Sequence, residues 1–388
     1  MERARVPVCK SCHHRQAPRS GVVVYLLVTD ALYVNSLARP VSGNNDPMSQ
    51  ESELLSPARV EAAAEGAQRV LDGLNKALLG QEDLCRMVLV AFLARGHVLL
   101  EGLPGLGKTE LVKALADLLG IETRRLQFTP DLLPGDVTGG HMLEEQADGS
   151  RGLIFHPGPV FTNLLLADEI NRASPKTQSA LLEAMQEHRV TVVGETRTLP
   201  RPFSVLATQN PIELEGTYPL PEAQLDRFLF KLDVGQVGPE TLATILTERR
   251  HGAVPNSDPV MSASELEGVL DAVGSVFLPT AVAGYIAALV TNTHPGPQAL
   301  SKVTDYVRFG ASPRAAIAIA ESARAHALLG RRPNVGFDDV RAVAPYALGH
   351  RLTLDYRARL DGVTGQGLAA AVIAATEEVQ PIGRSHRA

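Results

Sequence analysis

One stretch of the sequence decides the fold: Gly102-Leu103-Pro104-Gly105-Leu106-Gly107-Lys108-Thr109. It matches G-x-x-x-x-G-K-[ST], the P-loop pattern, whose glycines let the backbone curl so that successive N–H groups point at phosphate oxygens. We expect the Lys108 ammonium to reach the β- and γ-phosphates of a bound nucleotide, and the Thr109 hydroxyl to hold Mg²⁺. All eight residues are therefore predicted to bind the nucleotide.

The flanks of this stretch favour the same interpretation. The run His97-Val98-Leu99-Leu100 is short and mostly apolar, as a buried parallel strand should be. Residues 109–119 carry apolar side chains at helical spacing, and Gly120 ends the pattern. A glycine-rich surface loop that matches by chance would have neither flank. The sequence thus predicts a strand, a phosphate-binding loop and a helix in succession.

A second apolar run ends in two acids. Residues 164–167 read Leu-Leu-Leu-Ala and lead into Asp168 and Glu169. Ligands in open α/β sheets lie at the carboxyl edge of the strands, so we expect both carboxylates beside the P-loop. Asp168 would orient the Mg²⁺ shell, and Glu169 would position and deprotonate an attacking water. Asn210 follows a third apolar strand and would orient water or the γ-phosphate. The predicted fold class is α/β, a P-loop αβα sandwich with a parallel sheet.

Composition limits the other possibilities. The chain has 388 residues, which favours two or three domains. The net charge is −6, and this acidic balance makes a nucleic-acid partner unlikely on physical grounds. No apolar run is long enough to span a bilayer. The cysteines are Cys9, Cys12 and Cys85, too few for a disulfide framework, so we expect a reducing, cytoplasmic environment.

Residues 1–50 differ from the rest. They contain Cys9-Lys10-Ser11-Cys12-His13, which matches the haem c attachment pattern C-x-x-C-H. Haem attachment would require export of the protein and an axial ligand, and zinc binding would require a second Cys/His pair. The sequence shows no sign of either set of requirements. We therefore expect a disordered leader, with Met48 as an alternative start of the working protein. A mature chain beginning at Met1 would contradict that start.

The remaining chain divides by pattern into a core at 51–234, an all-helical part at 235–360 and a tail at 361–388 that we expect to be frayed. Two β-hairpins are expected in the core, near 141–160 and 190–199. Helices are expected near 57–79, 82–94, 174–188, 239–250, 262–276, 278–291, 313–329 and 337–350. Gly80-Gln81 either packs near an adenine or simply breaks a helix.

Several motifs together resemble the AAA+ ATPases. The P-loop, the acids at 168–169, Ala-Thr-Gln-Asn-Pro at 207–211 and Ser312-Pro313-Arg314 in a helical lid carry this resemblance. The detailed sequences of these and other motifs are similar to those of the MoxR subgroup, over about residues 55–355. The subgroup signatures are Gly158-Pro159-Val160-Phe161, Asp168-Glu169-Ile170-Asn171-Arg172, the run at 178–185 and the run at 216–228.

The resemblance implies further roles. It implies ATP and Mg²⁺ as ligands, Asn210 as sensor 1, Arg227 as an arginine finger that reaches the neighbouring subunit's site, and Arg314 as sensor 2 in the lid. The two hairpins would be the inserts that mark this clade. The family typically forms hexameric rings that act as chaperone-like remodellers. It often works with von Willebrand factor A-domain proteins, sometimes during metal insertion.

The sequence is compatible with four functions. The first is an ATP-driven protein remodeller. A DNA-handling motor would show salt-dependent DNA binding. A magnesium-chelatase-like subunit would co-purify with large subunits and act on a porphyrin. A nucleotide-switched scaffold would release almost no phosphate, although Glu169, Asn210, Arg227 and Arg314 favour hydrolysis. The sequence does not identify the client protein.

Overall fold

A computed structural model describes residues 55–103, 105–145, 151–211, 216–249, 258–297 and 299–378. The expectations for the leader, including Cys9, Cys12 and His13, fall outside these residues, as does Pro104 of the P-loop. Within the described ranges, no helix combines the length and the apolar character that a membrane crossing needs.

The elements follow the chain in an alternating order. The core begins with α1 (Pro57–Ala77), α2 (Glu82–Leu93), β1 (Val98–Glu101), α3 (Lys108–Leu119), β2 (Thr123–Gln127), α4 (Pro134–Thr138), β3 (Gly139–Glu145), β4 (Arg151–Pro157) and β5 (Leu164–Asp168). It continues with η1 (Ile170–Arg172), α5 (Pro175–Glu187), β6 (Arg189–Val192), β7 (Glu195–Thr198), β8 (Ser204–Gln209), α6 (Glu222–Leu225) and β9 (Phe230–Asp233). After these come α7 (Pro239–Glu248), α8 (Ala263–Ser275), α9 (Thr280–Asn292), α10 (Ser301–Tyr306), β10 (Val307–Phe309), α11 (Pro313–Leu329), α12 (Phe337–Leu348), η3 (Gly349–Arg351), β11 (Thr353–Leu354), α13 (Tyr356–Leu360) and α14 (Gly365–Ala375).

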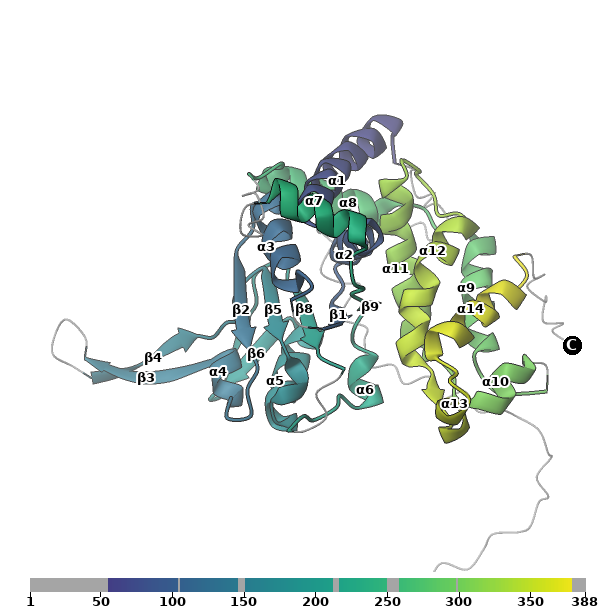
Figure 1. Cartoon of the computed structure of the whole chain (residues 1–388). Coiled ribbons are helices and arrows are strands. Elements are labelled where there is room, and N and C mark those ends of the chain that lie inside the picture. The colour runs from purple at the N-terminus through teal and green to yellow at the C-terminus, as the bar shows by residue number, and fades with distance from the viewer. Residues whose placement is uncertain are drawn as a thin grey trace, which may run out of the picture. The chain divides into compact units, whose positions relative to one another are not determined.

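A five-stranded parallel sheet in the order β2-β5-β8-β1-β9 forms the centre of the core (Figure 1). The P-loop strand β1 pairs with β8, with Glu101 opposite Gln209. On its other edge β8 pairs with β5, with Ala207 opposite Ala167. Because all these strands run in the same direction, the residues that follow β1, β8 and β5 meet at one edge of the sheet.

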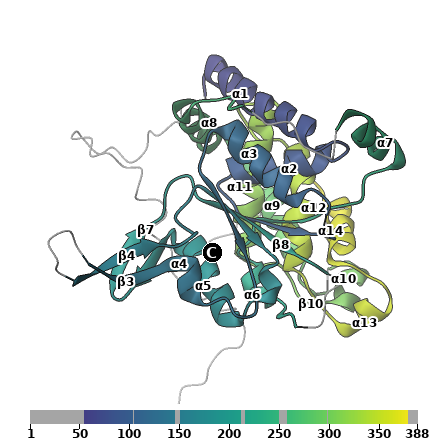
Figure 2. The ribbon, with the colours of Figure 1, turned by 60° about the vertical axis from the view of Figure 1, so that its left-hand side comes forward.

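Alternate residues of the strands enter two separate apolar clusters, one on each face of the sheet. In β1, Val98 and Leu100 pack with α1, α2 and α3, whereas Leu99 packs with the side chains of α5. In β5, Leu164 and Leu165 divide in the same way. Because successive side chains of a strand point to opposite faces, both faces of the sheet are apolar, and helices cover each of them (Figure 2). This arrangement confirms the predicted αβα sandwich.

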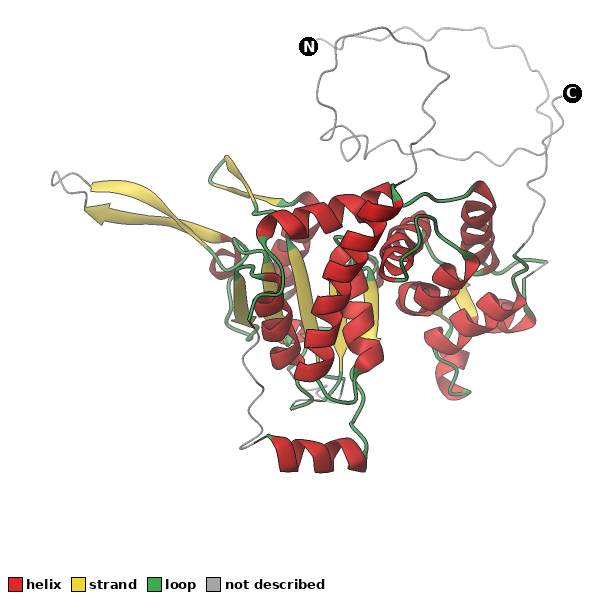
Figure 3. Cartoon of the chain, turned by 90° about the horizontal axis from the view of Figure 1, so that it is seen from above, coloured by secondary structure: helices red, strands yellow, loops and turns green. Residues whose placement is uncertain are grey.

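Both predicted hairpins are present as antiparallel pairs. β3 pairs with β4, and Figure 3 shows this hairpin projecting away from the sheet and its helices. Residues 146–150, between β3 and β4, lie outside the described part of the chain. β6 pairs with β7 across Val193 and Gly194, whose positive φ values of 51° and 82° suit a tight hairpin turn.

The C-terminal part is mostly helical, with α11 packed against α1, α2 and α8, but the short antiparallel pair β10–β11 departs from the predicted all-helical part. The predicted helices at 239–250, 262–276, 278–291, 313–329 and 337–350 are confirmed as α7, α8, α9, α11 and α12. The expectation of a frayed tail from 361 is wrong for its first part, because α14 lies in that segment. Thr364 caps α14, and Leu368, Ala369 and Val372 are buried against the lid. Burial of this face outweighs the low helix propensity of Gly365 and Gly367.

Candidate active site

The P-loop has the backbone that a phosphate cradle requires. Gly105 and Gly107 have φ values of 82° and 80°, in the region that favours glycine. A Cβ on Gly102 would lie 2.9 Å from the carbonyl oxygen of Val234, so this position also excludes a side chain. Lys108 and Thr109 occupy the first turn of α3, where the N–H groups have no partner within the helix. The loop thus fits a bound polyphosphate.

The Lys108 ammonium donates to the carbonyl of Gly102 at 2.6 Å, within the loop. Partial burial lowers the pKa of this ammonium, while the carboxylates of Asp168 and Glu169 act in the opposite direction. The predicted phosphate-binding lysine and the two predicted acids therefore lie within electrostatic reach of one another, as the shared sheet edge requires.

Asp168 and Glu169 are fixed by a residue that the sequence did not single out. The Thr208 hydroxyl, at the end of β8, donates to Oδ1 of Asp168 at 2.6 Å and accepts the Glu169 N–H at 2.8 Å. Glu169 has a φ of 56°, an uncommon conformation for a non-glycine residue that costs roughly 1–3 kcal/mol. Thr208 thus holds the backbone of Glu169 in a strained turn directly after β5.

Strand β2 supplies two further contacts to these acids. Arg125 Nη2 donates to Oδ2 of Asp168 at 2.7 Å and to Oε1 of Gln127 at 3.0 Å. Gln127 Nε2 in turn donates to Oε2 of Glu169 at 2.8 Å, and Arg172 Nη1 reaches the same oxygen at 2.9 Å. The roles of Arg125 and Gln127 could not be predicted from the sequence, because they depend on β2 being the neighbour of β5.

Asn210 follows β8 and is only 7% exposed. Its place in the chain puts it between the P-loop strand and the strand that ends in Asp168, as predicted. Gln209, just before it, donates to Glu101 at 3.0 Å, and Lys231 of β9 pairs with the same carboxylate at 2.7 Å. These contacts link the ends of β8, β1 and β9, and so they stiffen the carboxyl edge of the sheet, where Asn210 lies.

Arg227 lies in a different environment. It follows α6, and its Nη1 donates to the carbonyl of Leu182 in α5 at 2.7 Å. It lines an open cavity of about 600 Å³ together with Glu183, Glu187 and the polar side chains of β6 and β7. Burial, and next the positive charge of Arg314, lowers the pKa of its guanidinium, although arginine keeps its charge in proteins.

Arg314, in the first turn of α11, is close enough to Arg227 for its charge to lower the pKa of that guanidinium. Its Nη1 is 3.8 Å from Oδ2 of Asp226, the residue that precedes Arg227 in the chain. The structure therefore brings the predicted site residues together in two groups. One contains the P-loop, Asp168, Glu169 and Asn210, and the other contains Arg227 and Arg314.

Comparisons with known proteins define the class. The model of the ATPase family associated with various cellular activities (AAA) matches residues 97–230, and the model of the AAA lid domain matches residues 300–371. The crystal structure of a putative ATPase from Cytophaga hutchinsonii superposes with a TM-score of 0.76 at 36% identity, covering 83% of this chain and 98% of that one. The fold is that of an AAA+ ATPase with its helical lid.

Two relatives match most of the chain, and the name of one of them gives the family. Chaperone MoxR1 of Mycobacterium tuberculosis is 43% identical over 298 residues, which is 76% of this chain and 78% of that protein. The uncharacterized protein YeaC of Bacillus subtilis is 42% identical over 318 residues, 82% of this chain and 95% of that protein. The chain belongs to the MoxR family of AAA+ ATPases, which confirms the resemblance drawn from its motifs.

Proposed function

We propose that this chain hydrolyses ATP in a homo-oligomeric, hexameric ring and uses the energy to remodel other proteins. One observation supports hydrolysis above all others. The P-loop, the Asp168-Glu169 pair and Asn210 converge on one sheet edge from three neighbouring strands. A phosphate cradle, a metal-orienting acid, a water-activating acid and a polar orienting group are the parts that this reaction needs.

Each residue has a defined part in the proposal. Residues 102–109 hold the nucleotide, with Lys108 at the β- and γ-phosphates. Thr109 and Asp168 hold Mg²⁺, which when bound neutralises charge on the phosphates. Glu169 takes the proton from the attacking water, and Asn210 keeps that water or the γ-phosphate in line.

Arg227 and Arg314 complete the site from the neighbouring subunit in this proposal. Their proximity to each other supports joint delivery, since one face of a subunit would present both charges. Arginine supplied in trans accelerates other nucleotide hydrolases by ~10³–10⁵. A protein of this kind should therefore hydrolyse ATP only when assembled.

A protein client is supported by the β3–β4 hairpin. Met142, Leu143, Leu153 and Ile154 are between 38% and 69% exposed on this projecting hairpin. Exposed aliphatic side chains in such a group are typical of protein contacts. The relative named a chaperone is consistent with this role. A von Willebrand factor A-domain partner stays a prediction from the family resemblance.

A phosphate-release assay on assembled protein tests the proposal. Lys108→Ala should lose nucleotide binding, whereas Arg227→Ala should bind nucleotide but lose turnover. Mixing Arg227→Ala with Glu169→Gln should restore part of the turnover, because hybrid interfaces combine an intact acid with an intact arginine. Tight ATP binding by Lys108→Ala, or no recovery in demonstrated mixed assemblies, would contradict the assignments. Negligible turnover of the unaltered ring would favour the scaffold instead.

A further inference from the structure

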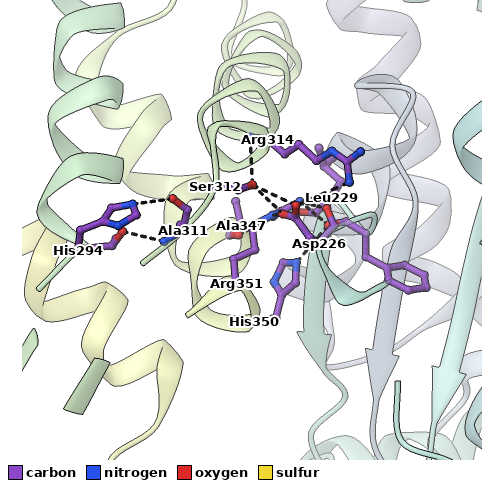
Figure 4. A network of polar contacts seen from close by, with 11 residues as sticks. Asp226, Leu229, His294, Ala311, Ser312, Arg314, Ala347, His350 and Arg351 are labelled. Carbon is purple, nitrogen blue, oxygen red and sulfur yellow. Dashed lines mark hydrogen bonds and ion pairs between the residues drawn. The ribbon is translucent and has the colours of Figure 1, made fainter. Parts of the chain in front are cut away.

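Arg351 is the most completely bonded arginine at the junction between the AAA+ core and the lid. It ends η3, directly after α12, and its side chain is 3% exposed. Its Nε donates to Oδ1 of Asp226 at 2.8 Å. Its Nη1 donates to the carbonyls of Leu229 and Ala347 at 3.1 and 2.5 Å, and its Nη2 to those of Asp226 and Phe228 at 3.0 and 2.6 Å. All five guanidinium N–H groups are used (Figure 4).

Most of these acceptors flank Arg227. Asp226 precedes it, and Phe228 and Leu229 follow it, so the lid arginine binds the backbone on both sides of the predicted finger. His350 adds a contact of 3.1 Å from its Nε2 to the Phe228 carbonyl. Burial, and next the charge of Arg351, holds the pKa of His350 well below its usual range, so this imidazole is neutral.

A second lid element reaches the same carboxylate. The Ser312 hydroxyl, at the N-terminus of α11, lies 3.2 and 3.0 Å from the two Asp226 oxygens, and Arg314 lies 3.8 Å from Oδ2. Asp226 therefore receives Arg351 from the end of α12 and Ser312 from the start of α11. Figure 4 shows these side chains meeting between the lid helices and the strand that follows Asp226.

The chemistry favours a rigid connection. A planar guanidinium with five occupied donors fixes both direction and distance, which a flexible lysine ammonium with three donors does not. Burial lowers the pKa of the Arg351 guanidinium, and its ion pair with Asp226 at 2.8 Å acts in the opposite direction, so this buried charge has a partner. Displacing the lid would leave buried carbonyls and a buried charge without partners, so the lid and the 226–229 segment should move together.

We infer that Arg351 is a positioning residue for Arg227. Through Asp226 and the carbonyls of Phe228 and Leu229, it fastens the segment that carries the arginine finger to the lid. A movement of the lid in one subunit would then shift the arginine that completes the next subunit's ATP site. This inference rests on the proposed function, in which Arg227 acts in trans.

Steady-state kinetics of the assembled Arg351→Met variant provide the test. We expect kcat to fall by about 10- to 100-fold, as for a displaced catalytic group, while KM for ATP stays nearly unchanged. Arg351→Lys should lose most of this activity too, because it cannot reach all five acceptors. Arg332→Met is the control: it removes a partly exposed lid arginine that is bonded to buried Asp339 at 2.5 Å, and it leaves Asp226 untouched. Its kcat should be close to that of the unaltered protein.

Mixed assembly separates positioning from a merely structural role. A Glu169→Gln subunit carries an intact finger and lid, so it should restore turnover at the intact ATP site of an Arg351→Met neighbour. No recovery in demonstrated mixed rings would overturn the inference, as would full turnover of Arg351→Met when Arg227→Ala is inactive. If Arg227→Ala kept its turnover, the proposed trans role of Arg227 would be contradicted, independently of the result for Arg351.

If Arg351→Met fails to fold, a second variant, Asp226→Asn, tests the positioning role of Arg351. Asp226→Asn retains the size of the side chain but removes its charge, and it should show a smaller loss of kcat with the same recovery in mixed rings. Unchanged turnover in both Asp226→Asn and Arg351→Lys would overturn the inference.

Discussion

The hydroxyl of Thr208 donates to Oδ1 of Asp168 at 2.6 Å, and the same oxygen accepts the N–H of Glu169. A single side chain of β8 therefore orients one acid and holds the backbone of the other. Thr208 is fully buried, so water cannot replace these bonds. The relationship makes Thr208 a determinant of the geometry at the end of β5, although it would touch neither nucleotide nor metal.

Replacing Thr208 with valine should expose this dependence. Valine keeps the shape but leaves the Glu169 N–H without its acceptor, so we expect a loss of stability of ~1–3 kcal/mol and a clear fall in ATP turnover. Thr208→Ser, which retains the hydroxyl, should lose much less of either. Denaturant unfolding and phosphate release measure the two effects. Turnover of Thr208→Val equal to that of the unaltered protein would contradict the positioning role.

Arg125 is expected to weaken Mg²⁺ binding. Its guanidinium pairs with the metal-orienting acid Asp168 at 2.7 Å and also adds positive charge close to the site. Because Arg125 is about half exposed, the pair contributes only ~0.2–1 kcal/mol. Arg125→Met should therefore lower the Mg²⁺ concentration at half-maximal turnover by about 1.4- to fivefold.

Arg124→Met is the control for that change. Arg124 lies on the same strand and pairs with Glu122 instead, at 2.9 Å. A Mg²⁺ titration of the two variants side by side separates the local pair from the general loss of a positive charge. Equal shifts in both variants would show that the Arg125–Asp168 contact is irrelevant to the metal.

The strand ends could be predicted from sequence, but the contacts between them could not. Apolar runs followed by Gly102, Asp168 and Asn210 mark buried parallel strands, and parallel strands bring their carboxyl ends to one edge. The sequence of β2, Thr-Arg-Arg-Leu-Gln, has no apolar run and does not reveal which strand lies beside it. The pairing of Arg125 with Asp168 and of Gln127 with Glu169 therefore emerges only from the strand order.

Long-range polar contacts have the same origin. Asp226 and Arg351 are separated by 125 positions in the chain, and each looks like an ordinary surface charge in its local sequence. Only the packing of the end of α12 onto the 226–229 segment buries the arginine and uses all its donors. The expectation of a frayed tail is wrong at 365–375 for a related reason, because local propensity does not reveal that one face of α14 is buried.

Acid should destabilise the fold through His97. Its Nδ1 accepts the Val205 N–H at 3.0 Å, so its Nε2 carries the proton and donates to the Met185 carbonyl at 3.1 Å. Burial lowers the pKa of His97 from 6.5 to about 4. The unfolded chain therefore binds more protons than the folded one between these two values, and stability falls as the pH falls through that window. The full loss is about 3 kcal/mol.

Denaturant midpoints between about pH 8 and about pH 4.5 would measure this loss. His97→Gln removes the titration while its amide can still accept from Val205 and donate to Met185, so its stability should depend less on pH. His188 and His350 also have lowered pKa values and should leave a residual slope. An identical slope in both proteins would show that the pKa of His97 is not lowered in the folded state.

The C-terminal helix α14 should be an integral part of the lid. Leu368 is 1% exposed and belongs to the main apolar cluster, whereas Leu360 in α13 is 78% exposed. Leu368→Ala should therefore cost ~2–5 kcal/mol of stability through lost burial and the cavity left behind. Leu360→Ala removes the same atoms from the surface and should change stability by no more than ~0.5 kcal/mol. Equal thermal unfolding of the two variants would mean that α14 does not pack on the lid in solution, and the original expectation of a frayed tail would then be correct.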